Sequence, residues 1–232
     1  MSVKDNLEKV KQQITQAAFQ SGRTPEEIQL IAVSKTKSVE LIKEALSAKQ
    51  TAFGENRIQE ALGKIEVLKN SPEVEWHLIG HLQKNKAKFC PGYFQWIHSV
   101  ESIKLAKILE ARCDLTNKNI NVLIQVNLSR EESKSGLQEW DEILRVAEYI
   151  SSGRWLKFRG LMTIPAPNLG EFRTRKIFEQ IREWRDKLRD ELDSPGITEL
   201  SMGMTADYNW AIQEGATMIR VGTAIFGSRE QQ

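Results

Sequence analysis

Short apolar runs alternate with longer amphipathic segments along almost the whole chain. The first segment, Asp5–Phe19, has apolar residues at helical spacing and ends near Gly22. After it, strand-like runs and helix-like segments follow one another in turn. The expected strands are Leu30–Ser34, Ala52–Gly54, Trp76–Gly80, Trp96–Ser99, Val122–Leu128, Leu156–Ile164, Glu199–Met202 and Met218–Val221. The expected helices are Val39–Ala48, Asn56–Leu68, Lys84–Phe89, Ile103–Leu115, Glu139–Ile150, Glu171–Leu192, Tyr208–Gln213 and Ala224–Phe226.

This alternation predicts an α/β protein with parallel strands joined by right-handed crossovers. Eight strand-helix units behind one leading helix are the number that closes a (β/α)8 TIM barrel. An open doubly wound sheet is the alternative, because a sequence does not show whether a sheet closes. No Pro- or Gly-rich linker divides the chain, so residues 1–232 are expected to form a single domain.

Composition and charge narrow the partners and the compartment. The 232 residues hold 33 Lys and Arg against 31 Asp and Glu, and a net charge of +2 does not favour nucleic acid or an anionic membrane surface. No stretch reaches the about 18 apolar residues of a membrane span, and Met1–Gln20 is not signal-like. Cys90 and Cys113 are too far apart for a metal knuckle or a redox pair. We therefore expect a cytoplasmic protein with reduced thiols.

Lys35 lies where the first apolar run ends, and a lysine there is unusual. An ammonium ion is costly to desolvate, so a lysine at the exit of a buried strand tends to lose its proton. The uncharged amine is then a good nucleophile toward aldehydes. The alternative is that the side chain of Lys35 reaches solvent while its stem covers apolar surface, and this segment alone favours that alternative.

The loops after the seventh and eighth strands carry glycine and hydroxyl residues at helix starts. Gly203 and Thr205 follow one strand, and Gly222 and Thr223 follow the next. Glycine lets a backbone approach an anion closely, and the free N–H groups of a helix start bind phosphate. The alternative is two turn glycines and a helix cap. Taken with Lys35, both loops predict a site for a phosphorylated aldehyde or sugar.

The histidines do not predict a metal site. His77 and His81 are four residues apart, as in a zinc-binding helix, but Trp76–Gly80 has a strand pattern. No metal is therefore expected. His98 lies in the next strand, facing either the core or the mouth of the barrel.

Several motifs resemble those of a known family. They are Ala32–Lys35, Phe53–Asn56, His77–Lys86, Leu161–Ile164, Ser201–Met204 with Asp207, and Arg220–Gly227. Over about Leu30 to Gly227 the chain resembles the YggS/PROSC family of pyridoxal-phosphate-binding proteins, also called PLP homeostasis proteins. That family is similar to the barrel domain of alanine racemase and of the fold-type III decarboxylases.

The resemblance implies a pyridoxal 5'-phosphate (PLP) site. Lys35 would carry PLP as a Schiff base, and Arg220 would approach either the ring nitrogen or the phosphate. The phosphate would be held by Ser201, Gly203, Gly222 and Thr223. Asn56 and His81 would line the pocket beside the ring. The sequence departs from the family at Arg57, where an aromatic residue is common, and at Thr205, where serine is usual.

The resemblance further implies a carrier without established catalysis, which maintains vitamin B6 and amino-acid balance by exchanging PLP with other amines. Racemisation needs two acid/base groups on opposite faces of the substrate carbon. In the racemases the second group is a tyrosine from another domain, and this chain ends at Gln232. Tyr208 is the tyrosine expected near the mouth, but it lies beyond the phosphate loop. A fold-type III racemase or decarboxylase and a cofactor-free Schiff-base aldolase are the alternatives.

The expected partners are PLP and small amines or amino acids, with PLP-dependent apoenzymes as candidate recipients. A closed barrel has no edge strands to pair, which is compatible with a monomer.

Overall fold

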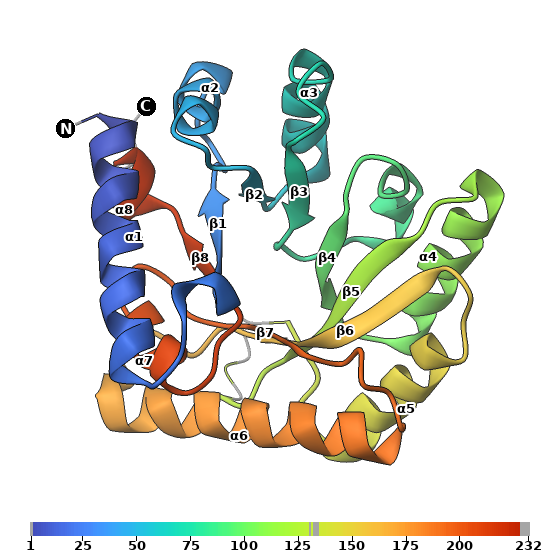
Figure 1. Ribbon diagram of the computed structural model, residues 1–232. Helices are drawn as coiled ribbons and strands as arrows, with labels where there is room; N and C mark the ends of the chain where they lie inside the picture. Colours follow the sequence, from blue (N-terminus) through green and yellow to red (C-terminus); the bar gives the residue numbers. More distant parts are fainter. Residues whose placement is uncertain (1, 130, 132–134, 228–232) are drawn as a thin grey trace.

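The computed structural model describes residues 2–129, 131 and 135–227, and its strands form one closed parallel barrel in sequence order (Figure 1). The strands are β1 (Gln29–Val33), β2 (Ala52–Glu55), β3 (Glu75–Leu78), β4 (Trp96–Val100), β5 (Ile120–Val126), β6 (Leu156–Thr163), β7 (Glu199–Ser201) and β8 (Met218–Val221). β1 pairs with both β2 and β8, which closes the sheet. The predicted (β/α)8 barrel is confirmed, and the open sheet is excluded.

Helices connect the strands around the outside of the barrel (Figure 1). They are α1 (Val3–Gln20), α2 (Val39–Ser47), α3 (Ile58–Val67), α4 (Ile103–Thr116), α5 (Trp140–Ser151), α6 (Gly170–Glu191), α7 (Tyr208–Gln213) and α8 (Thr223–Phe226), with 3-10 turns η1 (Pro25–Glu27) and η2 (Lys84–Phe89). Each predicted strand and helix is found within two residues of its expected bounds. The exception in type is η2, which is a 3-10 helix because so short a segment, followed by Pro91, takes the tighter turn.

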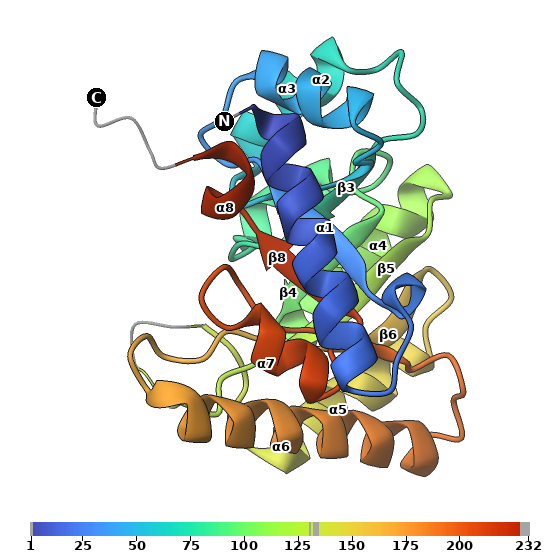
Figure 2. The ribbon, with the colours of Figure 1, turned by 60° about the vertical axis from the view of Figure 1, so that its left-hand side comes forward.

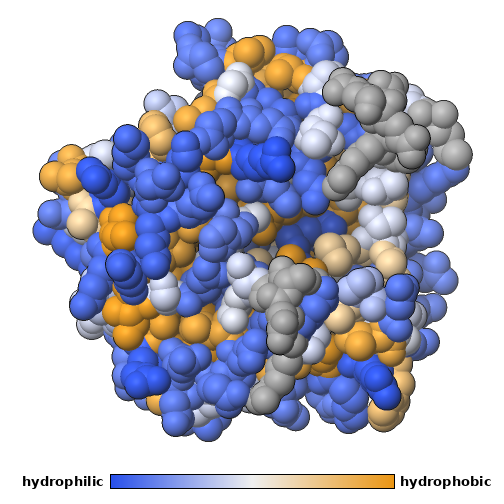
Figure 3. Space-filling view, turned by 180° about the vertical axis from the view of Figure 1, so that it is seen from behind, coloured by the Kyte–Doolittle hydropathy of each residue, from blue (hydrophilic) through white to orange (hydrophobic). Residues whose placement is uncertain are grey.

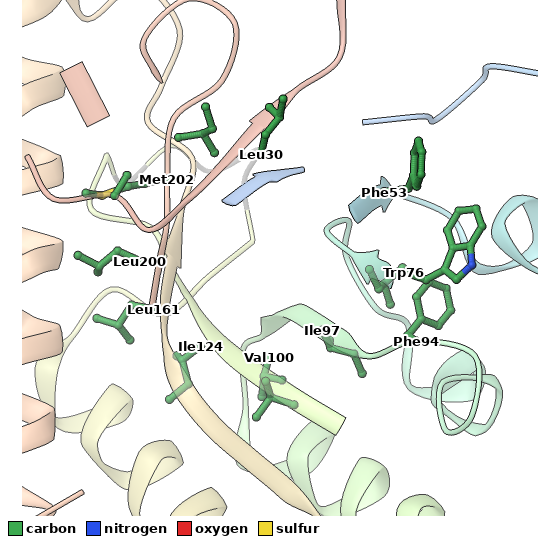
Figure 4. Packing of buried hydrophobic residues seen from close by; sticks show 14 of the residues in the cluster. Leu30, Phe53, Trp76, Phe94, Ile97, Val100, Ile124, Leu161, Leu200 and Met202 are labelled. Atoms are coloured by element: carbon green, nitrogen blue, oxygen red, sulfur yellow. The ribbon is translucent and has the colours of Figure 1, made fainter. Parts of the chain in front are cut away.

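Two apolar layers fill the fold because successive strand residues face opposite sides of a sheet. Outward-facing side chains such as Phe53, Ile97 and Leu161 pack beneath the helices, as Figure 4 shows for the larger cluster. A smaller cluster lies apart from it and is contributed mainly by alternate positions of the same strands. Its members are Ile31, Ala52, Trp96, Leu123, Met162 and Met218. The remaining inward positions are therefore open to polar groups.

The leading helix α1 covers the seam where the end of the chain meets its beginning. Figure 2 shows α1 running beside α7 and α8. Asn6 donates a hydrogen bond to the carbonyl of Ile225, and the Arg23 guanidinium donates to the carbonyls of Ile212 and Ala216. These contacts hold the carboxyl ends of α7 and α8 against α1. Within the described part of the chain, no helix is long and apolar enough to cross a membrane.

Candidate functional site

The carboxyl ends of all the strands meet at one face of a parallel barrel, which is where such folds hold their ligands. The predicted site residues follow these strand ends, and the molecule is hollowed near the middle of one face, with hydrophilic residues in the hollow (Figure 3).

Lys35 is half-buried in a tight turn directly after β1. The turn is closed by the Lys37 N–H, which donates to the Ser34 carbonyl at 3.0 Å, and the Ser34 N–H donates to Gly54 on β2. Thr36 has a φ of 63°, a left-handed conformation that a β-branched residue rarely adopts. Such a conformation persists only where its surroundings enforce it.

Two buried charges, Glu55 and Lys64, and the half-buried Glu60 hold this turn, and we call these three residues the lysine clamp. The Lys64 ammonium donates to the Ser34 carbonyl at 2.7 Å, to Glu55 Oε1 at 2.7 Å and to Glu60 Oε1 at 2.6 Å. The Ser34 hydroxyl also donates to Glu55 Oε1, at 2.6 Å. The residue before Lys35 is therefore fixed through both its backbone and its side chain.

The clamp reaches the residue after Lys35 as well. The Thr36 N–H donates to Glu60 Oε1, so both neighbours of Lys35 are tied to the same cluster. Glu55 is fully buried, and burial raises the pKa of its carboxyl against the opposing hydrogen bonds from Lys64 and Ser34. Its Oε2 accepts no hydrogen bond from any residue that the structure describes.

The β8 loop lies against the end of β1. A Cβ atom on Gly222 would lie 3.2 Å from the Val33 carbonyl oxygen, so glycine permits the close approach of the two strand ends. Exposed Thr223 begins α8 at the same place. In the neighbouring β7 loop, Gly203 has a φ of 93°, and a Cβ there would lie 2.6 Å from Ala211 Cβ. Gly203 is thus required by its backbone conformation, and Gly222 leaves the space that the neighbouring strand end occupies.

Arg220 on β8 is buried inside the same end of the barrel, with 3% of its surface exposed. Its Nη1 donates to Ser201 Oγ at 2.5 Å, and its Nη2 donates to the Thr163 carbonyl at 2.8 Å. Its backbone N–H donates to the Gly203 carbonyl. Burial lowers the pKa of Arg220 to about 10, while the charge of Asp207 acts in the opposite direction. The guanidinium therefore stays protonated at neutral pH.

The Ser201 hydroxyl faces the barrel interior rather than the open mouth, and it is fully buried. It lies 2.8 Å from His98 Nδ1, and His98 Nε2 lies 2.9 Å from His77 Nδ1. His77 Nε2 in turn faces Glu75 Oε2 at 3.3 Å. We call Glu75, His77, His98 and Ser201 the imidazole chain. Burial lowers the pKa of both histidines, so both rings are neutral at pH 7.

Asn56 and His81 lie toward the rim of the site, after β2 and β3. Half-buried Asn56 is tightly packed, since a Cβ on Gly80 would lie 2.4 Å from its carbonyl oxygen. Asn56 and His81 both line a cavity of about 360 Å³. The His81 side chain is 51% exposed, and its Nδ1 lies 3.1 Å from Glu101 Oε1 and 3.2 Å from Ser135 Oγ. His81 is thus an outer residue of the site.

The two histidines with zinc-like spacing do not share a ligand geometry. His77 points into the barrel from β3, whereas His81 lies beyond the strand at the exposed rim. The described residues contain no group of three or more His, Cys, Asp or Glu side chains that could hold a metal ion.

Sequence reasoning missed the residues that support Lys35 and Arg220. Glu60 and Lys64 are spaced i, i+4 on a predicted helix, which pairs them but gives no sign of burial. His98 was left between core and mouth, and the structure places it fully buried in the barrel interior. Alternation along β4 put His98 on the same side as Trp96, which was the available signal.

Comparisons with known proteins agree with this architecture. The family model described as "Alanine racemase, N-terminal domain" matches residues 4–230. The pyridoxal phosphate homeostasis protein of Pasteurella multocida is 44% identical over 232 residues, which cover 99% of each chain. The solved structure of PipY from Synechococcus elongatus with PLP bound is 35% identical, has a TM-score of 0.87, and covers 97% of this chain and 100% of PipY.

A more distant structure bears on the fold alone. Alanine racemase from E. faecalis is 19% identical with a TM-score of 0.61, and the match covers 94% of this chain but 58% of the racemase. The barrel, the full-length matches and the motifs around Lys35 and Arg220 confirm the resemblance noted in the sequence. This chain belongs to the alanine racemase N-terminal domain family and, within it, to the pyridoxal phosphate homeostasis proteins.

Proposed function

We propose that this chain binds PLP through Lys35 and serves as a PLP carrier that maintains PLP and amino-acid balance, without a catalytic cycle of its own. The names of its relatives and the PLP-bound PipY structure support the proposal. The observation in this structure that carries it is the placement of Arg220. A charged, buried guanidinium lies at the barrel end where the Lys35 turn and the two glycine loops also lie.

The donors at this end fit PLP. When bound, PLP supplies an aldehyde that bonds to a primary amine and a ring that can accept electrons. Lys35 supplies the amine, on a turn whose two flanks are fixed by the lysine clamp. We assign the phosphate to the backbone N–H groups around Gly203, Gly222 and Thr223, while Ser201 acts through Arg220. Asn56 and His81 line the outer side of the pocket.

Arg220 favours the binding of PLP over catalysis by PLP. A guanidinium facing the ring nitrogen keeps a proton off that nitrogen and weakens the electron sink. Facing the phosphate, it would instead pair with the anion. In both orientations it uses N–H groups other than those donated to Ser201 and Thr163.

The tyrosines give no second acid or base at the mouth. The Tyr208 hydroxyl donates to Gln13 on α1, so it points away from the site. Tyr149 lies on α5, and Tyr93 precedes β4 at the opposite end of the barrel. A racemase mechanism, which needs such a group opposite the lysine, is therefore disfavoured.

The proposal extends to the domain organisation, oligomeric state, location and partners of the protein. We propose that residues 1–232 act as one domain and as a monomer in the cytoplasm, and that metal ions take no part. Small amines and amino acids would receive PLP from Lys35, and PLP-dependent apoenzymes are the candidate final recipients.

Titration with PLP tests the binding site. Purified protein should turn yellow on addition of PLP, with saturation at one PLP per chain. Lys35→Ala should abolish the yellow species at the site, whereas the matched control Lys37→Ala, two residues away, should retain it. A colourless wild-type protein would overturn the proposal and favour a cofactor-free aldolase.

Proton exchange separates a carrier from an enzyme. PLP-loaded protein is incubated with a panel of amino acids in D2O, and deuterium at the α-carbon is followed by NMR. The proposal predicts no exchange above that of free PLP at the same concentration. Steady multiple-turnover exchange with any amino acid would contradict the carrier function.

A further inference from the structure

The imidazole chain ends at a carboxylate that can only accept hydrogen bonds. Trp96 Nε1 donates to Glu75 Oε1 at 2.7 Å, and Gln29 Nε2 donates to Oε2 at 2.7 Å. Burial alone would raise the pKa of Glu75, but hydrogen bonding and charge from His77, with those from Trp96 and Gln29, lower it to about 2. The donors on Trp96 and Gln29 act whatever the charge of His77. Glu75 is therefore ionised at neutral pH.

An ionised Glu75 determines which nitrogen of each imidazole carries the proton. A neutral imidazole has one donor and one acceptor nitrogen. His77 Nε2 faces the carboxylate at 3.3 Å without the geometry of a full hydrogen bond, and the electrostatically favoured arrangement places its N–H there, which leaves Nδ1 as an acceptor. His98 Nε2 then donates to His77 Nδ1 across 2.9 Å, so His98 Nδ1 is also an acceptor. The partner that remains to donate to His98 Nδ1 is the Ser201 hydroxyl, at 2.8 Å.

The opposite direction is unfavourable at the Glu75 end. If His98 Nδ1 donated to Ser201, His77 Nδ1 would donate to His98, and the lone pair of His77 Nε2 would face the Glu75 carboxylate. His77 is fully buried, so a lone pair on its Nε2 facing a carboxylate oxygen would be left without a donor, which is costly. A doubly protonated ring does not rescue it, because burial disfavours imidazolium here and Arg220 adds a nearby positive charge.

We propose that Glu75, His77 and His98 are positioning residues, which act through Ser201 to fix the guanidinium of Arg220 at the cofactor site. With its proton committed to His98, the Ser201 oxygen presents its lone pairs to Arg220 Nη1. The Thr163 carbonyl holds Nη2, so two anchors set the plane of the guanidinium. The direction of the hydrogen bonds in the imidazole chain follows from this fold alone, while their link to the cofactor rests on the proposed function.

The proton positions are tested first, in PLP-free protein. The chain has three histidines, so long-range 1H–15N spectra of protein with 15N-labelled histidine are simple to assign from His77→Gln, His81→Gln and His98→Gln. His77 and His98 should both be neutral with the proton on Nε2 at pH 7 and above. A proton on Nδ1 of either ring would contradict the proposed hydrogen-bond direction in the imidazole chain. This test does not depend on PLP binding.

The positioning role is tested by PLP binding and by the spectrum of bound PLP. Ser201→Ala and His98→Phe should each weaken PLP binding about tenfold, as expected for the loss of one hydrogen bond in a chain that ends on a charged group. Each should also shift the absorption maximum of bound PLP, which a merely structural role would leave unchanged. Ser201→Thr keeps the hydroxyl and should restore both properties, and exposed Ser47→Ala on α2 is the matched control.

The outcomes separate the two proposals. A wild-type protein that takes up no PLP overturns the proposed function, while the NMR result still decides the direction of the chain. If the wild type binds PLP and Ser201→Ala binds it equally well with an unchanged spectrum, the positioning role is wrong.

Discussion

Two buried polar networks support the same end of the barrel, and they are built from opposite kinds of group. Beneath Lys35, the lysine clamp uses formal charges, with one ammonium between two carboxylates. Beneath Arg220, the imidazole chain uses neutral rings and a hydroxyl and keeps its one carboxylate at the far end. The clamp fixes a strained backbone turn, for which strong undirected attraction suffices. The chain orients a planar guanidinium, for which the direction of each hydrogen bond matters.

The carboxylates of the two networks differ in how completely they are satisfied, although each network keeps one buried atom without a hydrogen-bond partner among the described residues, Glu55 Oε2 in the clamp and His77 Nε2 in the imidazole chain. Glu55 in the clamp has a buried oxygen that no described residue contacts by a hydrogen bond, and burial raises the pKa of that carboxyl. Glu75 in the chain has donors on both oxygens, and its pKa is lowered to about 2. A buried charge is costly when it loses its partner. The clamp should therefore be the more sensitive of the two networks to mutation.

Removing the ammonium of the clamp should have the largest effect. Lys64→Met leaves Glu55 buried without its cation and should lower the free energy of unfolding by about 3–5 kcal/mol. Urea unfolding measures this loss. Lys69→Met, at a lysine whose side chain is 64% exposed, is the control and should change stability little. A loss for Lys64→Met no larger than that of the control would contradict the clamp.

The double variant Glu55→Leu/Lys64→Met sharpens the test, because it removes both charges and leaves apolar side chains. It should recover most of the stability lost in Lys64→Met. It should still bind PLP more weakly than wild type, since the Ser34 side of the Lys35 turn is no longer held. Recovery of both stability and binding would show that the clamp does not position Lys35.

A substitution at Glu75, the end of the imidazole chain, should lower the stability of the protein less than the loss of Lys64. Glu75→Gln replaces one acceptor oxygen by an amide donor that faces either Trp96 or His77, and should lower the free energy of unfolding by about 2 kcal/mol. Exposed Glu73→Gln on the same segment is the matched control. Equal stability of the two variants in urea would remove Glu75 from the chain.

The dependence of stability on pH should be a smaller effect, and it should come from the histidines of the imidazole chain. The folded pKa values of His77 and His98 lie below the ordinary value of 6.5, so the folded state binds fewer protons than the unfolded state. Stability is then fully present above pH 6.5 and falls as the pH is lowered, by up to about 1.4 kcal/mol per pH unit for each ring. Tm measured from pH 7.5 to pH 5 should fall less steeply in His98→Phe than in wild type. Parallel curves would contradict the neutral, buried state of His98.

The clamp should respond in the opposite sense. Because the folded pKa of Glu55 lies above 4.5, its contribution to stability decreases as the pH rises through and above that value. Glu55→Gln should remove this decrease, which is followed by the same thermal scans. A steeper decrease in the variant would show that the carboxylate is better satisfied in the folded protein than its contacts indicate.

Local patterns were enough to predict the strands, the helices and the strand-end positions of Lys35, Gly203 and Gly222. The (β/α)8 closure followed from the count of units, and the register that brings Gly222 against Val33 follows from β1–β8 pairing. The networks were not predictable in this way. His98 meets Ser201 across 103 positions in sequence, and only the closed barrel brings the two together.

Lys64 shows the same limit. Its charge is typical of an exposed helix face, and its burial depends on how α3 packs against the end of β1. Ser201 shows what a motif leaves open, because the motif predicts a phosphate contact for a hydroxyl that faces Arg220 and His98 in the structure.

The central claim, that Lys35 holds PLP, is tested most directly by trapping the bound state. PLP-loaded protein is reduced with borohydride and digested, and the peptides are mapped by mass spectrometry. The account predicts one reduced PLP on the peptide that contains Lys35, with none on peptides that contain only Lys37 or Lys64. A label mainly on another lysine, or no label on protein that has been saturated with PLP, would contradict it.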